Sequence, residues 1–207
     1  SLTTNGILLK QQARALAEAG LTRINVSLDS LMREKFAQLT RRDQMDRVLE
    51  GLQEVARYPS IRPIKINAVA LRGFSEEEVL TLVQFARSKA YRMRWIEFMP
   101  LDADQRWRKE EILTGGEIKT IIEEVYGPLV PIPGDPAETA RRYTFSDGIG
   151  EVGFINPVSE PFCATCDRIR LTADGQLRTC LFATTETDLR AVLRSGGDDT
   201  QITQVLR

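Results

Sequence analysis

Hydrophobic and polar residues follow two different periods through the first half of the chain. Alternation with a period of two predicts three strands, over residues 22–28, 63–71 and 91–99. Apolar residues three and four positions apart predict helices over residues 7–19 and 45–57. A third helix is expected from Ser75 to about Lys89, because Ser75 is a good N-cap and Glu78 would complete a capping box. This order of strands and helices is typical of parallel βα units.

Side chains with possible chemical roles lie within these strands or at their C-terminal ends. They are Thr3, Asn5, Ser27, Asp29, Lys65, Asn67, Glu97 and Met99. In βα barrels the C-terminal edge of the strands holds the active site. Residues 2–6 have the pattern of a strand end followed by a turn. Three strands and one strand end cannot close a barrel, so we expect an α/β fold in which residues 1–102 form the C-terminal half of an incomplete parallel TIM-like barrel and further N-terminal units are missing.

The sequence changes character after about residue 102. A connector that contains four prolines runs from residue 128 to residue 136. The expected elements around it are a helix over 115–126, strands over 141–145 and 151–155, and helices over 183–194 and 199–207. We interpret residues 103–207 as an appendage that lies across the open face of the barrel.

Composition narrows the possible functions. The chain has 207 residues, of which 42% are hydrophobic and 28% charged, a net charge of −1, no histidine and three cysteines. The charge argues against nonspecific nucleic-acid binding, and the apolar runs are too short to span a bilayer. Without histidine the chain lacks the usual general base and the commonest metal ligand. Three cysteines close together argue against a disulfide framework and favour a reduced, cytoplasmic location.

The three cysteines have the spacing of a metal site. Cys163 and Cys166 form a C-x2-C pair, and Cys180 follows after thirteen residues. The short gap lets two thiolates face one metal centre, and the third would return along a hairpin whose turn is Asp174-Gly175. A structural zinc site needs four ligands, and a cubane iron–sulfur cluster normally takes four cysteines. Three cysteines leave three interpretations: a cluster with one iron open to a non-protein ligand, a zinc site, or unrelated core thiols.

Two arginines follow the cysteine pair. Arg168 and Arg170 would share one face of a strand over residues 168–172, paired with residues 176–179. Guanidinium groups bind phosphate oxygens in bidentate fashion, so the pair suits a polyphosphate. A solvated strand face is the alternative, because charged side chains are mostly exposed. Beside a metal site with an open position, we favour the polyphosphate.

Five segments resemble one enzyme family. TTNG, RINVSLDS, IKINAV, RWIEFMPL and FCATCDRIRLTADGQLRTCLF are similar to molybdenum cofactor biosynthesis protein A, the GTP 3′,8-cyclase family. The resemblance covers essentially the whole chain, which would correspond to the C-terminal two-thirds of such a protein. It implies a radical-SAM lyase with two [4Fe-4S] clusters. The N-terminal cluster cleaves S-adenosyl-L-methionine, and the C-terminal cluster binds the guanine of GTP. The product, 3′,8-cyclo-7,8-dihydroguanosine 5′-triphosphate, is formed in the first step of molybdenum cofactor (molybdopterin) biosynthesis.

The resemblance also implies roles for individual residues. The cluster ligands would be Cys163, Cys166 and Cys180. The GTP contacts would be Thr3, Lys65, Arg168 and Arg170, and the S-adenosylmethionine contacts would be Ser27 and, through its backbone, Met99. The implied partners are GTP, a downstream cyclic pyranopterin monophosphate synthase and a second copy of the chain in a homodimer, with no nucleic acid and no membrane.

The chain departs from the family pattern in three places. The C-x3-C-x2-C loop, the glycine-rich S-adenosylmethionine motif and the C-terminal double glycine are absent from the sequence. We therefore expect this chain alone to be inactive as a cyclase and to hold one cluster. Two other interpretations stay open: a non-enzymatic zinc-binding scaffold, and another radical-SAM enzyme with an auxiliary cluster.

Overall fold

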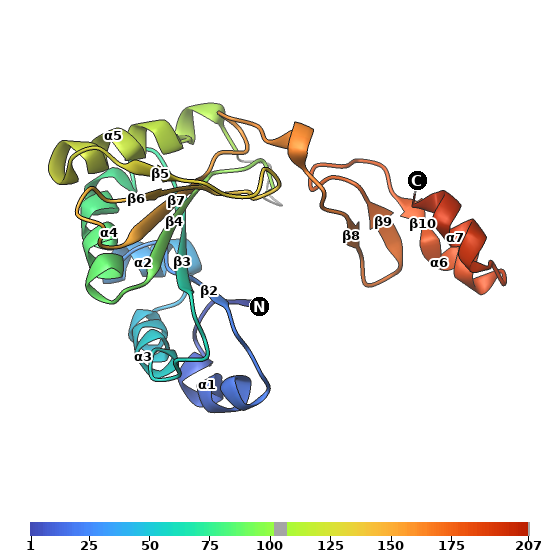
Figure 1. Cartoon of the computed structure of the whole chain (residues 1–207), viewed down its shortest axis with the longest axis horizontal. Coiled ribbons are helices and arrows are strands. Elements are labelled where there is room, and N and C mark those ends of the chain that lie inside the picture. The colour runs from blue at the N-terminus through green and yellow to red at the C-terminus, as the bar shows by residue number, and fades with distance from the viewer. Residues whose placement is uncertain (102–106, 207) are drawn as a thin grey trace. The chain divides into compact units, whose positions relative to one another are not determined.

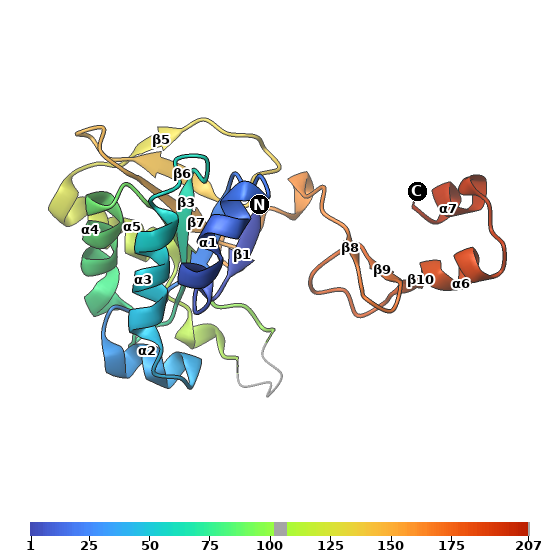
Figure 2. The same ribbon diagram turned by 90° about the horizontal axis from the view of Figure 1, so that it is seen from below.

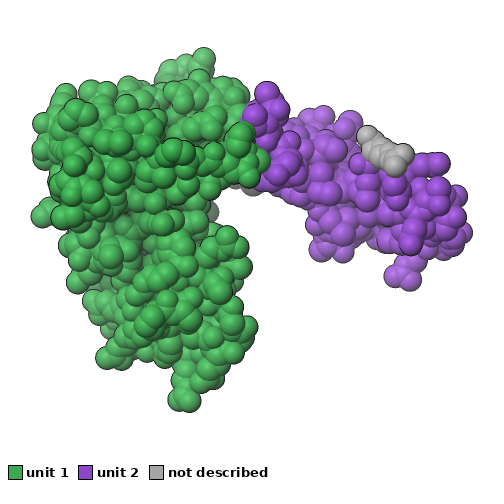
Figure 3. Space-filling view, viewed as in Figure 1, with its two compact units in different colours: residues 1–162 green, residues 163–207 purple. Residues whose placement is uncertain are grey.

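The computed structural model describes residues 1–101 and 107–206. The chain divides into two compact units, unit 1 (Ser1–Phe162) and unit 2 (Cys163–Arg207), which Figure 3 colours separately. The predicted domain boundary at residues 102–103 lies outside the described residues.

Unit 1 is built on one sheet, which has seven strands within the described residues. In chain order they are β1 (Leu2–Thr4), β2 (Ile24–Ser27), β3 (Ile64–Ala70), β4 (Arg92–Glu97), β5 (Val130–Ile132), β6 (Arg141–Thr144) and β7 (Glu151–Ile155). Their spatial order is β1-β2-β3-β4-β7-β6-β5. The pairs from β1 to β4 and the β4–β7 pair are parallel, whereas β5, β6 and β7 pair antiparallel. The parallel-dominated α/β fold is therefore confirmed.

Strand β7 corrects the expected place of the segment after residue 102. We expected residues 141–145 and 151–155 to belong to an appendage across the sheet. Instead β7 lies beside β4, and β6 continues the sheet beyond β7. Val152 and Phe154 of β7 are buried in the same core as the earlier strands. Burial of these two side chains explains why the segment joins the sheet.

The helices of unit 1 cover one face of this sheet (Figures 1 and 2). They are α1 (Leu9–Glu18), α2 (Arg33–Thr40), α3 (Met45–Val55), α4 (Val79–Ser88) and α5 (Gly115–Tyr126), with short 3-10 turns η1 (Glu76–Glu78) and η2 (Lys109–Glu111). The core consists of alternate strand residues, such as Val26, Ile66 and Trp95, packed against the helices. Among the described residues, no helix is both long and apolar enough to cross a membrane.

Glu78 does not form the predicted capping box. Ser75 makes no side-chain capping bond, and its hydroxyl accepts the backbone N–H four residues earlier at 3.1 Å. Glu78, which is 3% exposed, accepts the N–H groups of Leu31 and Met32 at 2.8 and 3.0 Å and the hydroxyl of Ser30 at 2.6 Å. The carboxylate thereby fixes the loop before α2, a helix that the sequence pattern did not predict.

Unit 2 contains a small sheet and two short helices. Its elements are η3 (Cys163–Thr165), β8 (Arg170–Leu171), β9 (Gln176–Arg178), β10 (Thr187–Asp188), α6 (Leu189–Arg194) and α7 (Asp199–Val205). Strands β8 and β9 form the predicted hairpin, and Gly175 in its turn has φ +85°. The helix expected from residue 183 begins only at Leu189, because Asp188 caps it by accepting the N–H of Ala191 at 2.8 Å.

Gly51 provides a test of the packing between α1 and α3. A Cβ at this position would lie 2.9 Å from the carbonyl oxygen of Gly6 and 2.9 Å from the Cβ of Leu9. Gly51→Ala should therefore lower the free energy of unfolding by about 1–3 kcal/mol, although alanine favours the helix. Gly116 is the control, because its nearest neighbour would be Thr114 Oγ1 at 4.0 Å, and Gly116→Ala should not destabilise. Denaturant titration measures both; a Gly51→Ala chain as stable as the parent contradicts the packing.

Candidate functional site

The face of the sheet opposite the helices carries polar side chains. The strand register places Thr3, Asn25, Lys65, Arg92 and Glu151 in one row. Two positions further along the strands, a second row consists of Ser27, Asn67, Arg94 and Gly153. Residues in register point to the same side of a sheet. These nine residues are called the polar sheet face below.

The polar sheet face has more cationic than anionic groups. Its one carboxylate, Glu151, pairs with Arg92 at 3.1 Å and lies 3.8 Å from Arg142. Lys65 and Arg94 form no ion pair within the part of the chain that the structure describes. Burial, and next the nearby charge of Arg94, lowers the pKa of Lys65, and burial also lowers the pKa of Arg94. Two cations that lie close together and form no ion pair suit an anionic ligand.

Thr3 and Lys65, both predicted to contact GTP, lie in the same row. Asn25 stands between them: its amide donates to the Thr3 hydroxyl at 3.0 Å, and it pairs in register with Lys65. Two strand spacings, or about 10 Å, therefore separate Thr3 from Lys65. The structure brings the two predicted residues of unit 1 to one surface.

Arg94 is a residue of this face that sequence reasoning missed. Its signal was present in the alternation of β4, where it is the polar residue between buried Met93 and Trp95. Gly153 lies beside it in register. In the same row, the buried Oδ1 atom of Asn67 has no hydrogen-bond partner among the described residues. The row thus offers one cation and one free acceptor.

A cavity of about 380 Å³ lies at the C-terminal ends of β1 and β2. Its lining residues are Asn5, Ile7, Ser27, Asp29, Phe36, Thr40 and Arg42. Asp29 accepts the N–H of Val69 at 2.9 Å, and burial raises the pKa of its carboxyl group. Ser27 and Asp29 are thus placed at the sheet edge as predicted. Met99 does not line this cavity, and its carbonyl accepts the N–H of Leu101 at 2.8 Å.

The cysteines lie in unit 2 on a turn and beyond a hairpin. Cys163 and Cys166 are joined by the single turn η3, in which the Cys166 N–H donates to the Cys163 carbonyl at 3.2 Å. Cys180 follows two residues after β9. All three thiols are exposed and none is in a disulfide. The Cys166 sulfur accepts a hydrogen bond from Arg168 at 3.1 Å, and the Cys180 sulfur accepts one from the Phe182 N–H at 3.4 Å.

This donor set fits an iron–sulfur cluster in its chemistry. Thiolates are the usual cluster ligands, and hydrogen bonds to their sulfurs tune the cluster. In the described ranges, no three Cys, Asp or Glu side chains are gathered closely enough to hold a metal ion. The β8–β9 hairpin connects the cysteine turn to Cys180, and its register pairs Arg170 with Arg178.

The structure separates the two arginines that were expected on one strand. Arg170 lies in β8, but Arg168 precedes the strand, which is shorter than the predicted residues 168–172. Arg168 contacts the Cys166 sulfur, as described above. Arg170 is paired across the hairpin with Arg178, whose charge is neutralised by Glu186. Arg170 itself has no ion pair among the residues that the structure describes.

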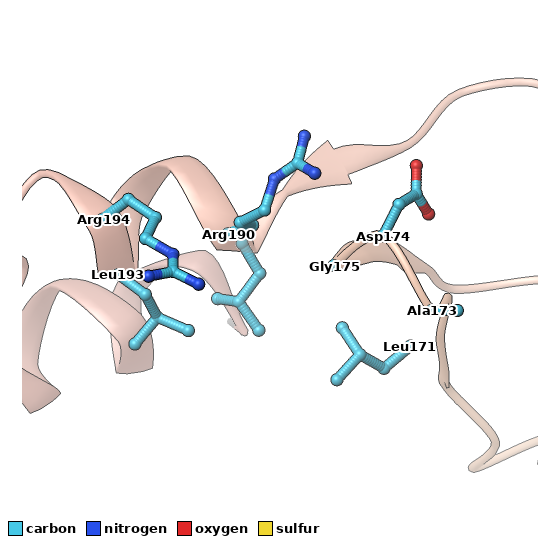
Figure 4. Close-up of a pocket in the computed structure, with 8 residues that line it drawn as sticks. Leu171, Ala173, Asp174, Gly175, Arg190, Leu193 and Arg194 are labelled. Atoms are coloured by element: carbon cyan, nitrogen blue, oxygen red, sulfur yellow. The ribbon is translucent and has the colours of Figure 1, made fainter.

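Unit 2 also has a cavity of about 460 Å³ between the hairpin turn and α6 (Figure 4). Leu171 on the hairpin and Leu193 on α6 lie on its two sides. Gly175 and Arg190 are in close contact beside this cavity. The Gly175 carbonyl accepts the Arg190 N–H at 3.1 Å, and a Cβ on Gly175 would lie 2.6 Å from Arg190 Cβ. Neither the cysteines nor Arg168 or Arg170 line this cavity, so it is separate from the cysteine site.

Matches to models of known protein families show which family the chain belongs to. Residues 91–207 match the model of Molybdenum Cofactor Synthesis C. The chain belongs to the Molybdenum Cofactor Synthesis C family. Residues 1–86 match the Radical SAM superfamily. The family resemblance found in the sequence is therefore confirmed.

Three curated relatives of this Molybdenum Cofactor Synthesis C member are named as GTP 3′,8-cyclases. The chain is 46% identical to GTP 3′,8-cyclase of Streptomyces coelicolor, 44% identical to that of Rhodopirellula baltica and 45% identical to GTP 3′,8-cyclase 2 of Mycobacterium tuberculosis. The alignments cover 100%, 100% and 98% of this chain. They cover 61%, 58% and 57% of the relatives, so the chain spans about three-fifths of their length.

Lys65 should reduce the stability of this Molybdenum Cofactor Synthesis C chain when no anion is bound. Its lowered pKa means that folding disfavours the charged form. Lys65→Met should therefore raise the free energy of unfolding at neutral pH. The gain should shrink as pH rises through the folded-state pKa, where the parent lysine also becomes neutral. Denaturant titrations at neutral and alkaline pH measure this, with the exposed Lys89→Met as control. Loss of stability in Lys65→Met at neutral pH contradicts the prediction.

Proposed function

We propose that this chain is the part of a GTP 3′,8-cyclase that holds the substrate-binding iron–sulfur cluster. The observation that carries the proposal is the 44–46% identity over the chain with proteins of that name. Three exposed thiols, with two arginines between the second and the third, support it. The reaction would convert GTP to 3′,8-cyclo-7,8-dihydroguanosine 5′-triphosphate, which would pass to cyclic pyranopterin monophosphate synthase.

In this proposal Cys163, Cys166 and Cys180 hold a [4Fe-4S] cluster, which when bound supplies an iron open to the guanine base. The three thiolates leave that position without a protein ligand, because no histidine or fourth cysteine is in the sequence. Arg168 donates a hydrogen bond to one of the ligand sulfurs.

The residues for the triphosphate are proposed for each unit separately. In unit 2, Arg170 forms no ion pair with a carboxylate among the described residues, and it lies opposite Arg178 in the hairpin. With Arg168 it supplies guanidinium groups that can each bind phosphate oxygens in bidentate fashion. In unit 1, Thr3 offers a hydroxyl, and Lys65 and Arg94 offer cations on the polar sheet face. An anion there would offset the unfavourable burial of both cations.

The S-adenosylmethionine contacts are proposed at the C-terminal edge of the parallel strands. Ser27 and its neighbours in the 380 Å³ cavity supply a hydroxyl, an amide and a carboxylate. Met99 would contribute through its backbone just beyond β4. In this proposal the parallel strands of unit 1, β7 included, are part of an incomplete radical-SAM barrel, whose C-terminal edge carries the active site.

Anaerobic reconstitution with iron and sulfide tests the cluster assignment. We expect about one four-iron cluster per chain, because three cysteines are present. Cys166→Ser should lose most of that iron. Metal analysis and the visible absorbance of the brown protein measure both. Two clusters per chain, or stoichiometric zinc in place of iron, would contradict the assignment.

Replacing the arginines tests the triphosphate site. Each charged hydrogen bond contributes roughly 1.5–3 kcal/mol, so Arg168→Ala and Arg170→Ala should each weaken GTP binding by about 10–100-fold. Guanosine, which has no phosphates, should lose much less affinity in the same variants. Arg170→Ala should keep its full cluster content. Arg194→Ala, an exposed arginine that lines the separate cavity of unit 2, is the control. Parent-like GTP affinity in both variants would place the triphosphate elsewhere.

A further inference from the structure

Glu97, the last residue of β4, is a buried carboxylate whose partners are all hydrogen-bond donors from other segments. It is 2% exposed. One oxygen accepts the N–H groups of Val158 at 3.0 Å and Ser159 at 2.9 Å. The other accepts the hydroxyl of Ser159 and lies 3.4 Å from the N–H of Gly115 at the start of α5. Within the described residues it has no cationic partner.

Three of the four donors belong to the segment that leads to the cysteines. Residues 156–160 follow β7 as a tight turn, closed by the Glu160 N–H to the Asn156 carbonyl at 3.1 Å. The Asn156 side chain packs on the start of α5: a Cβ on Gly115 would lie 2.2 Å from its Oδ1 atom. Ser159 is four residues from Cys163. The turn is therefore held from one side by Glu97 and from the other by α5.

The donor arrangement requires a carboxylate. Glu97 receives four donors on two oxygens and offers no proton in return. Gln has the same shape, but its NH2 group cannot accept hydrogen bonds from N–H or O–H donors. The hydrogen bonds to one of the two carboxylate oxygens would therefore be lost. A buried charge without a cation is retained only where such donors compensate for lost water.

We propose that Glu97 is a positioning residue for the cluster ligands. It fixes the backbone at Val158 and Ser159 and so restrains the segment of unit 1 that is joined directly to Cys163. This inference rests on the proposed function, because it assumes a cluster on the cysteines. Residues that orient metal ligands from outside the ligand set affect metal affinity by about 10–100-fold. We expect Glu97, which acts through the backbone, to lie at the lower end.

The test compares the full chain with its Glu97→Gln variant after reconstitution. Iron release to a chelator should be about 10-fold faster in Glu97→Gln. Amide hydrogen exchange in residues 157–162 should also be faster, because a neutral amide oxygen is a weaker acceptor for the two N–H groups than a carboxylate oxygen. Release of iron from Glu97→Gln at the parent rate overturns the inference.

Glu78→Gln is the matched control. Glu78 is also buried, and it also accepts two successive backbone N–H groups and a serine hydroxyl. It holds the loop before α2 rather than the segment before the cysteines. Both variants should lower the denaturant midpoint, but Glu78→Gln should release iron at the parent rate. Equal acceleration in both variants overturns the inference, since general loss of stability would then explain it.

A second pair of variants covers the case in which Glu97→Gln does not fold. Gly115→Ala pushes a Cβ into Asn156 and displaces the same turn, whereas the neighbouring Gly116→Ala meets open space. Gly115→Ala should release iron faster than Gly116→Ala; equal rates overturn the inference. A parent chain that takes up no iron defeats the proposed function itself. A loaded parent with no difference among the variants defeats the positioning role of Glu97 alone.

Discussion

The two-residue period of parallel strands in register is the constraint on which the rest of unit 1 depends. Every second residue of β2, β3 and β4 is buried under the helices, and all of these residues are apolar except Glu97 at the end of β4. The residues between them must share the other face, because the register leaves no alternative. Lys65 and Arg94 are therefore brought together by the burial of Ile66 and Trp95 on the opposite side. The core thus determines where the cations of the polar sheet face lie.

Two buried glutamates, Glu78 in η1 and Glu97 in β4, hold loops of unit 1 in the same manner. Glu78 and Glu97 each accept two successive backbone N–H groups and a serine hydroxyl from another part of the chain. Such bonds are stronger than neutral ones, because the acceptor is charged. One fixes the loop that follows the edge residues Ser27 and Asp29. The other fixes the turn that precedes the cysteines. Each glutamate thus holds a segment of unit 1 that adjoins residues with proposed ligand contacts.

Local patterns in the sequence predicted much of this structure. Alternation placed β2, β3 and β4, and the Asp174-Gly175 signal placed the hairpin, because both depend on neighbouring residues. Two of the errors, at Glu78 and at β7, involve partners distant in sequence. Glu78 fitted a local capping box, but its partners lie 46 to 48 residues away. The pairing of β7 with β4 spans the proline-rich connector and the two antiparallel strands before β7. Arg168 was predicted to lie in a strand, but it precedes β8 and contacts the Cys166 sulfur.

The central claim is that the three cysteines hold a cluster with one iron open to the guanine of GTP. The most direct test is electron paramagnetic resonance of the reduced, reconstituted chain with and without GTP. The account predicts that GTP changes the cluster signal, and that guanine labelled with nitrogen-15 adds a coupling to that nucleus. A cluster signal that GTP leaves unchanged, with no coupling to the labelled base, would contradict the claim.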